Sequence, residues 1–286
     1  MRALGDGAAA GGAAAAAAAG GALCRWAEAF DAPRALDGGG ACSAHAGRGF
    51  EAACATFNLG AALATLATQR ELKAAAELFQ QAAGAFGVVR ASARAAAWLG
   101  GGTTDLSADC LHTLERLMLA QAQRCYYEKL LAERRPSQQA LSCLAAAAAQ
   151  LYAEAAGAIE LAHRAPLTRL GGGEWTAAVA ALASLYGALA RLHAAAAHAA
   201  RGEHGERLGQ LDRAQQAAAA AARGATRLPR GAAAHVREAR QLVQEAHAHA
   251  RHENETVYFD AVPPCDALPP CTATCLVKPL LPPELT

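Results

Sequence analysis

Apolar side chains recur at every third or fourth position through most of the chain from residue 50 onward, and this is the spacing of one face of an α-helix. The first such stretch runs from Phe50 to about Arg90, and a polar turn at Gln69 to Leu72 divides it into two predicted helices. Each predicted helix carries its own apolar stripe. The two stripes consist of Phe57, Gly60, Leu63 and Leu66, and of Leu78, Phe79, Ala82, Ala83 and Phe86.

The same pattern predicts further helices, separated by capping and breaking residues. One helix begins after Asp105 or Ser107, since either residue can serve as its N-cap, and ends near Glu133. Pro136 breaks this helix, because proline disfavours helix at the residue before it, and Ser137 can cap the helix that follows. Apolar stripes predict three more helices, at about 175–200, 208–227 and 232–254.

These elements predict an all-α fold in which antiparallel helix pairs form a curved scaffold similar to tetratricopeptide solenoids. Hydrophobic residues make up 53% of the chain and many are alanine, whereas aromatic residues make up 5%, which argues against a β-rich core. A Pro-rich, extended tail follows the last helix. We expect an Ala/Gly tract at 1–22 to be disordered, the helical domain to cover 23–281, and 282–286 to end the tail.

Charge, cysteines and motifs narrow the function classes. The formal net charge is +1, so no global field attracts nucleic acid or an anionic membrane. The 9 cysteines are scattered and form no CxxC pair, which indicates reduced thiols in a cytoplasmic protein. We expect neither a secretory signal nor an integral membrane segment. Motifs of serine hydrolases, P-loop NTPases, zinc proteases and cysteine phosphatases are absent from the sequence, so we predict no enzyme and no cofactor.

Five sequence blocks occur in a fixed order and together resemble the Bro1 domain, a helical scaffold of the endosomal sorting machinery. The closing block is most similar to the branch of that family that also carries a tyrosine-phosphatase-like part. The family's domain begins with a longer portion that includes a small β-element, and an Ala/Gly tract stands there in this chain, so we expect no β-element. The blocks are Phe50–Ala61 (FEAACATFNLGA), Phe79–Phe86 (FQQAAGAF), Leu117–Gln123 (LMLAQAQ), Gly202–Leu208 (GEHGERL) and His252–Leu280.

The resemblance implies an adaptor that binds the C-terminal helix of an ESCRT-III subunit (a charged multivesicular body protein) and associates with endosomes. It places the apolar partner-binding patch at Tyr126, at Ala140 or Leu141, and at Leu144. Leu141 and Leu144 are three residues apart and share a helix face, while Tyr126 comes from the preceding helix. The alternative is that these residues are plain core. A Rho-effector-like signalling scaffold without ESCRT-III binding is the second functional hypothesis.

Two smaller features near the last helix have alternative interpretations. The resemblance implies that Tyr258 is a contact or phosphorylation site for a Src-type kinase. Alternatively, Val257, Tyr258 and Phe259 form an apolar strap that packs on the scaffold. A histidine-rich stretch from His247 to Glu253 has one pair at metal-binding spacing, but we interpret it as a solvated helix face and predict no metal site.

Overall fold

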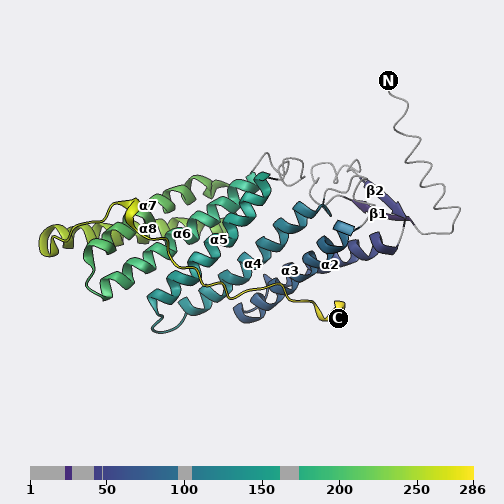
Figure 1. Ribbon diagram of the computed structural model, residues 1–286, viewed down its shortest axis with the longest axis horizontal. Coiled ribbons are helices and arrows are strands. Elements are labelled where there is room, and N and C mark those ends of the chain that lie inside the picture. The colour runs from purple at the N-terminus through teal and green to yellow at the C-terminus, as the bar shows by residue number, and fades with distance from the viewer. Residues whose placement is uncertain (1–22, 28–41, 47, 96–104, 162–173) are drawn as a thin grey trace, which may run out of the picture.

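The computed structural model describes residues 23–27, 42–46, 48–95, 105–161 and 174–286. The Ala/Gly tract at 1–22 lies outside these residues, so its predicted disorder stays a prediction. Figure 1 shows an elongated row of helices with the strands near one end and the chain's last segment lying across the row. The elements are β1 (Leu23–Ala27), β2 (Cys42–Ala46), α2 (Arg48–Ala67), α3 (Leu72–Ala95), α4 (Ala108–Leu131), α5 (Gln138–Leu161), α6 (Glu174–Ala200), α7 (His204–Gly224) and α8 (Arg230–Glu253).

The predicted all-α architecture is confirmed, because each helix from α2 to α8 packs against the next one along the chain. The polar turn after residue 67 separates α2 from α3, and the break around Pro136 separates α4 from α5. Both serine caps form as expected. The Ser107 hydroxyl accepts a hydrogen bond from the Cys110 N–H at 3.2 Å, and the Ser137 hydroxyl accepts one from the Ala140 N–H at 3.3 Å.

The two short strands correct the expectation that this chain lacks a β-element. β1 and β2 pair antiparallel, with Leu23 opposite Ala46 and Ala27 opposite Cys42. Each strand has only five residues. β1 (LCRWA) does not alternate apolar and polar residues, and β2 (CSAHA) alternates only with alanine and cysteine as its apolar residues, so periodicity gave no clear strand signal here.

The helix interfaces are close because alanine and glycine occupy much of the buried surface. Gly60 of α2 lies against the Phe86 ring of α3, and a Cβ at this glycine would come within 3.0 Å of that ring. The few aromatic side chains pack on one another between helices. Phe57 and Phe86 meet edge-on at 5.4 Å, and Tyr152 of α5 stacks on Tyr186 of α6 at 5.6 Å.

The C-terminal tail crosses the helix row as an extended strap (Figure 1). Its backbone is held in turn by α7, α5, α4 and α3. Arg213 donates to the Leu268 carbonyl at 3.0 Å, and the Thr274 N–H donates to the Cys143 carbonyl at 3.0 Å. Further along, the Leu280 N–H donates to the Gln80 carbonyl at 3.0 Å. The predicted extended tail is thus an integral layer of the fold.

Two buried glutamine side chains hold the tail. The Gln123 amide donates to the Thr274 carbonyl at 2.9 Å and accepts from the Leu276 N–H at 3.0 Å, as a neighbouring strand would. The Gln80 amide oxygen accepts from the Lys278 N–H at 3.2 Å. Both glutamines are buried, so their amides need these partners to avoid the cost of an unpaired polar group.

A hydrogen-bonded chain of side chains connects α4, α6 and α5. With its proton on Nδ1, neutral His193 donates to the Gln138 amide oxygen at 2.8 Å, and its Nε2 accepts from the Tyr127 hydroxyl at 2.9 Å. Burial lowers the pKa of His193 to about 4, because desolvation disfavours the imidazolium. At neutral pH the imidazole is therefore uncharged and both of its nitrogens are hydrogen-bonded.

Two helices, α2 and the Trp175–Ala200 part of α6, are long and apolar enough to cross a membrane on length and composition alone. In the structure both pack against neighbouring helices, as the core helices of a bundle also do. Length and composition therefore assign no membrane span, and the prediction that the chain has no integral membrane segment stays a prediction.

Substituting Gly84 by alanine should displace the tail, because a Cβ at this position would overlap the Leu280 carbonyl. We expect Gly84→Ala to lower the free energy of unfolding by about 1–3 kcal/mol and to speed hydrogen exchange of the Leu280 amide. Gly187→Ala on α6 is the matched control, since a Cβ there meets nothing within 4 Å. The control should be neutral or stabilise by up to about 1 kcal/mol. Equal effects of the two substitutions would contradict the tail assignment.

His193 should make the fold sensitive to mild acid. In the folded protein its pKa is about 4, below the ordinary value of 6.5. The stability that the neutral imidazole contributes to the folded state is therefore complete above pH 6.5 and is lost as the pH falls toward 4. The loss should be about 2–3 kcal/mol in the free energy of unfolding. Urea titrations between pH 7 and pH 4 should show a shallower pH dependence for His193→Gln than for the wild type. His252→Gln, an exposed control, should retain the wild-type slope.

Candidate partner-binding groove

A groove of about 440 Å³ lies where α4, α5 and the tail meet. The end of α4 forms one wall and the first turns of α5 form the second. The tail closes the third side. The lining residues are Tyr126, Lys129 and Leu130 of α4, Glu133 just after its end, Ala140, Cys143 and Leu144 of α5, and Thr274 and Leu276 of the tail.

Helical periodicity explains why these side chains face one another. The α4 positions 126, 129 and 130 follow the spacing i, i+3 and i+4, and the α5 positions 140, 143 and 144 follow the same spacing. The turn around Pro136 reverses the chain, so the two faces lie side by side. Leu144 is 7% exposed and forms the floor, while Leu276 is 52% exposed and stands at the edge.

Three of the four predicted partner-binding residues come together in this groove. Tyr126, Ala140 and Leu144 all line it. Leu141 does not, because it is fully buried in the core between helices. The face of α5 toward the groove is centred near Ala140, between Cys143 and Leu144, and Leu141 is rotated by about 100° from Ala140 toward the core. Of the two alternatives that the sequence left open, the geometry therefore favours Ala140.

The tail supplies lining residues that sequence reasoning missed. Thr274 and Leu276 reach the groove because the Gln123 amide holds their backbone, and Thr274 lies 151 residues beyond Gln123 in sequence. No local signal places a segment so distant beside α4. In contrast, Lys129 and Leu130 follow from Tyr126 by the i+3 and i+4 rule and were predictable.

The charges of the groove lie at its rim. Lys129 and Glu133 line the α4 side and are both exposed, whereas the floor is formed by Leu144 and the small side chain of Ala140. An apolar floor with both signs of charge at the edge suits an amphipathic helix better than a uniformly charged ligand.

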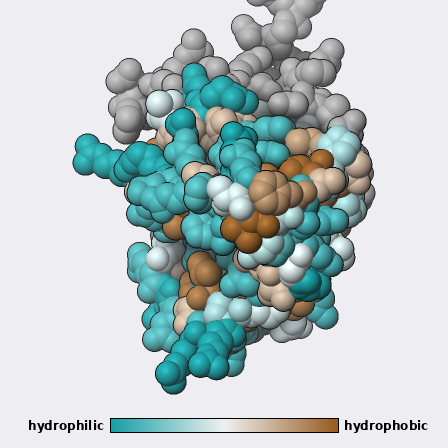
Figure 2. Space-filling view, turned by 90° about the vertical axis from the view of Figure 1, so that its left-hand side faces the viewer, coloured by the Kyte–Doolittle hydropathy of each residue, from teal (hydrophilic) through white to brown (hydrophobic). Residues whose placement is uncertain are grey.

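Tyr258 lies in the turn that follows α8, beside the first residue of α7. Its side chain is 41% exposed and its ring stacks on His204 at a centroid distance of 3.4 Å. Val257 and Phe259 are 62% and 72% exposed. The interpretation of these three residues as a strap packed on the scaffold is therefore wrong for Val257 and Phe259. Figure 2 views the molecule from the side of α7 and α8 and shows apolar side chains surrounded by polar surface.

The turn around Tyr258 is fixed by the buried Asn254. Its side-chain amide donates to the Asp260 carbonyl and accepts from the Asp260 N–H, each at 3.0 Å. Phe259 has φ 55°, a left-handed conformation that is unusual for an aromatic residue. The reciprocal hydrogen bonds hold this conformation, because the turn cannot relax without unpairing the buried asparagine.

Two of the histidines of α8, His247 and His249, contact carboxylates. His247 lies 2.7 Å from the Asp212 carboxylate, and Glu253 lies 2.6 Å from Arg207 and 2.9 Å from His249. The hydrogen bond from Arg207 lowers the pKa of Glu253. Within the described ranges, no group of three or more His, Cys, Asp or Glu side chains is arranged to hold a metal ion.

The sequence and the fold match known proteins. Over 90 residues the chain is 38% identical to the vacuolar-sorting protein BRO1 of Arabidopsis thaliana, and over 136 residues 32% identical to programmed cell death 6-interacting protein of Xenopus laevis. These alignments include 29% and 46% of this chain but only 11% and 15% of the two relatives. The chain therefore matches a small part of each relative's length.

Solved structures share the arrangement over most of the chain. A structure described as an ALIX BRO1 CHMP4C complex matches with a TM-score of 0.78 and 26% identity, covering 91% of this chain and 71% of that chain. A second ALIX structure, in complex with a viral late-domain peptide, matches with a TM-score of 0.80 and 26% identity, covering 93% of this chain and 37% of that one. The family model for the BRO1-like domain matches residues 23–286, and this chain therefore belongs to the BRO1-like domain family.

Proposed function

We propose that this chain is a non-enzymatic adaptor whose groove between α4, α5 and the tail binds the C-terminal helix of an ESCRT-III subunit. In this role it would act on the cytoplasmic side of endosomes, in sorting to multivesicular bodies. The observation that carries the proposal is the convergence of Tyr126, Ala140 and Leu144 on one apolar groove. A related BRO1 domain is described in complex with CHMP4C, which supports a partner of this kind.

The groove has the features that helix recognition needs. An amphipathic helix presents apolar side chains at i, i+3, i+4 and i+7, and these would rest on Leu144, Leu130 and the exposed Leu276. Ala140 is smaller than the leucines around it, so it leaves room for a large partner side chain. Lys129 and Glu133 at the rim can each pair with an opposite charge on the polar flank of the helix.

The same adaptor could be regulated at Tyr258 by a Src-type kinase. Its partly exposed side chain supports access, and phosphorylation would place a doubly charged group beside His204 and disrupt the ring stacking. Release of that stacking would loosen the start of the tail, because Tyr258 lies only a few residues before the strap begins.

Placing a charge in the groove should weaken helix binding. The measurement is a titration of a labelled ESCRT-III C-terminal helix peptide with the full chain. We expect Tyr126→Asp and Leu276→Asp each to weaken binding at least about tenfold, because a carboxylate cannot be buried unpaired under an apolar helix. Leu276 is half-exposed, so its substitution leaves the core intact. Leu281→Asp is the matched control on the same tail, since Leu281 is 50% exposed and lies outside the groove.

The outcome separates the two functional hypotheses. If both groove variants retain wild-type affinity, the groove assignment is wrong. A chain that binds GTP-loaded small GTPases and no ESCRT-III helix would instead support the Rho-effector-like scaffold. The same titration with a panel of GTPases provides that comparison.

Removing the Gln123 amide should weaken the groove from a distance. Gln123→Leu leaves the Thr274 carbonyl and the Leu276 N–H without their partner, so the tail should detach and the groove should lose its third wall. We expect helix affinity to fall about three- to tenfold and the Leu276 amide to lose protection in hydrogen exchange. Gln150→Leu, at an exposed glutamine of α5, should change neither quantity. Intact tail protection in Gln123→Leu would contradict this mechanism.

A further inference from the structure

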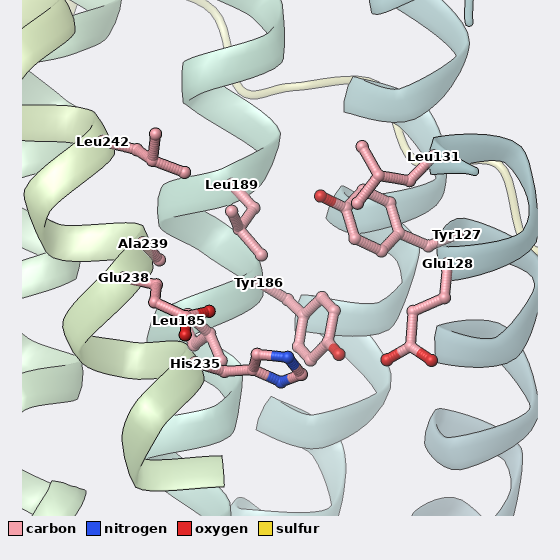
Figure 3. Close-up of a pocket in the computed structure, with 10 residues that line it drawn as sticks. All are labelled: Tyr127, Glu128, Leu131, Leu185, Tyr186, Leu189, His235, Glu238, Ala239 and Leu242. Atoms are coloured by element: carbon pink, nitrogen blue, oxygen red, sulfur yellow. The ribbon is translucent and has the colours of Figure 1, made fainter. Parts of the chain in front are cut away.

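A second pocket, of about 350 Å³, lies on another side of the end of α4 (Figure 3). α6 forms its floor, and α4 and α8 stand on either side. Its lining is distinct from that of the groove, because α4 contributes positions 127, 128 and 131 here and positions 126, 129 and 130 there. The lining residues are Tyr127, Glu128, Leu131, Leu185, Tyr186, Leu189, His235, Glu238, Ala239 and Leu242.

Apolar side chains form the floor and extend onto the rim. Leu185 and Leu189 lie on successive turns of α6, so their side chains follow one another along the floor. Leu131 and Leu242 stand on opposite walls and are 46% and 53% exposed. Large aliphatic residues left exposed on both walls of one pocket indicate a surface that a partner covers.

The polar groups of the pocket are acidic and aromatic. Glu128 and Glu238 line opposite sides, His235 lies between them, and no lysine or arginine is among the described lining residues. Arg124 reaches Glu128 at 3.4 Å from its own helix, whereas Glu238 forms no ion pair within the described part of the chain.

Two buried tyrosines form a neutral part of the lining beside the carboxylates. Tyr127 and Tyr186 meet edge-to-face at 5.8 Å, and both rings border the pocket in Figure 3. Burial raises the pKa of each phenol, so both stay neutral, and the Tyr127 hydroxyl is already hydrogen-bonded to His193. Two carboxylates in an otherwise neutral and apolar lining favour a lysine ammonium or an arginine guanidinium on an apolar stem.

We propose that this pocket docks an amphipathic helix of a partner protein, which inserts a lysine or arginine side chain between Glu128 and Glu238. Apolar residues on the same face of that helix would cover Leu131 and Leu242. The two exposed leucines favour a helix over a small amine, because a small ligand inside the pocket would leave both of them in water. The acidic lining disfavours an anionic membrane as the occupant.

The test is a selection followed by a titration. A displayed library of helices of about 14 residues, roughly four turns, is randomised along one face and selected on the full chain. Binders are then depleted on the double variant Glu128→Gln/Glu238→Gln, which keeps the side-chain shapes and removes both charges. We expect the remaining peptides to carry one lysine or arginine with apolar residues three or four positions away.

One such peptide is then measured against the matched variants. The double variant should bind the peptide about five- to tenfold more weakly than the wild type does. Replacing the peptide's basic residue by glutamine should lower its affinity for the wild type by the same factor and should not change its affinity for the double variant. Leu242→Ser should also weaken it, whereas Glu245→Gln, at an exposed glutamate of α8, should not. Peptides without a basic residue, equal binding to the double variant, or no peptide that depends on the pocket would each overturn the proposal.

The proposals for the groove and for this pocket can be tested independently of each other. Leu276→Asp lies in the groove and should leave binding at this pocket unchanged, and Leu242→Ser should leave ESCRT-III helix binding unchanged. A loss of both activities in either variant would indicate a folding defect, which circular dichroism and thermal unfolding would detect.

Discussion

The buried Gln123 amide is the interaction on which the arrangement of this domain depends. Its amide donates to the Thr274 carbonyl and accepts from the Leu276 N–H, so the tail pairs with α4 as a strand pairs with its neighbour. An unpaired buried amide would cost about 1–3 kcal/mol for each missing hydrogen bond. The helices and the tail are therefore stable together, and the tail becomes the third wall of the groove that its docking creates.

Small residues make this docking possible. Gly84 lets the backbone of α3 approach the Leu280 carbonyl, and Gly205 does the same for α7 and the Ala261 carbonyl. These contacts explain the role of some residues in the sequence blocks that resemble the Bro1 domain. Gln80 and Gly84 belong to one block and Gln123 belongs to another, and all three hold the tail. These blocks thus include the residues that seat the closing segment.

The end of α4 contributes to two surfaces of different chemistry. One side of the helix presents Tyr126 and Lys129 to the groove beside the tail, and another presents Tyr127 and Glu128 to the pocket beside α8. The hydrogen bonds from Tyr127 through His193 to Gln138 connect this end of α4 to α6 and α5 and hold it in place. A rigid helix end with two unlike faces suits a scaffold that holds two partners at once.

The sequence by itself determined the helices, their serine caps and the all-α class, because helical periodicity and capping are local properties that ten to twenty residues express completely. It also placed Tyr126 and Leu144 in the groove, through a resemblance to a known family. Tertiary structure decided the rest. Whether position 140 or 141 faces the groove depends on the rotation of α5 against its neighbours, and the contribution of Leu276 depends on a contact between segments far apart in the chain. Such contacts follow from the packing of the whole chain, which no local pattern records.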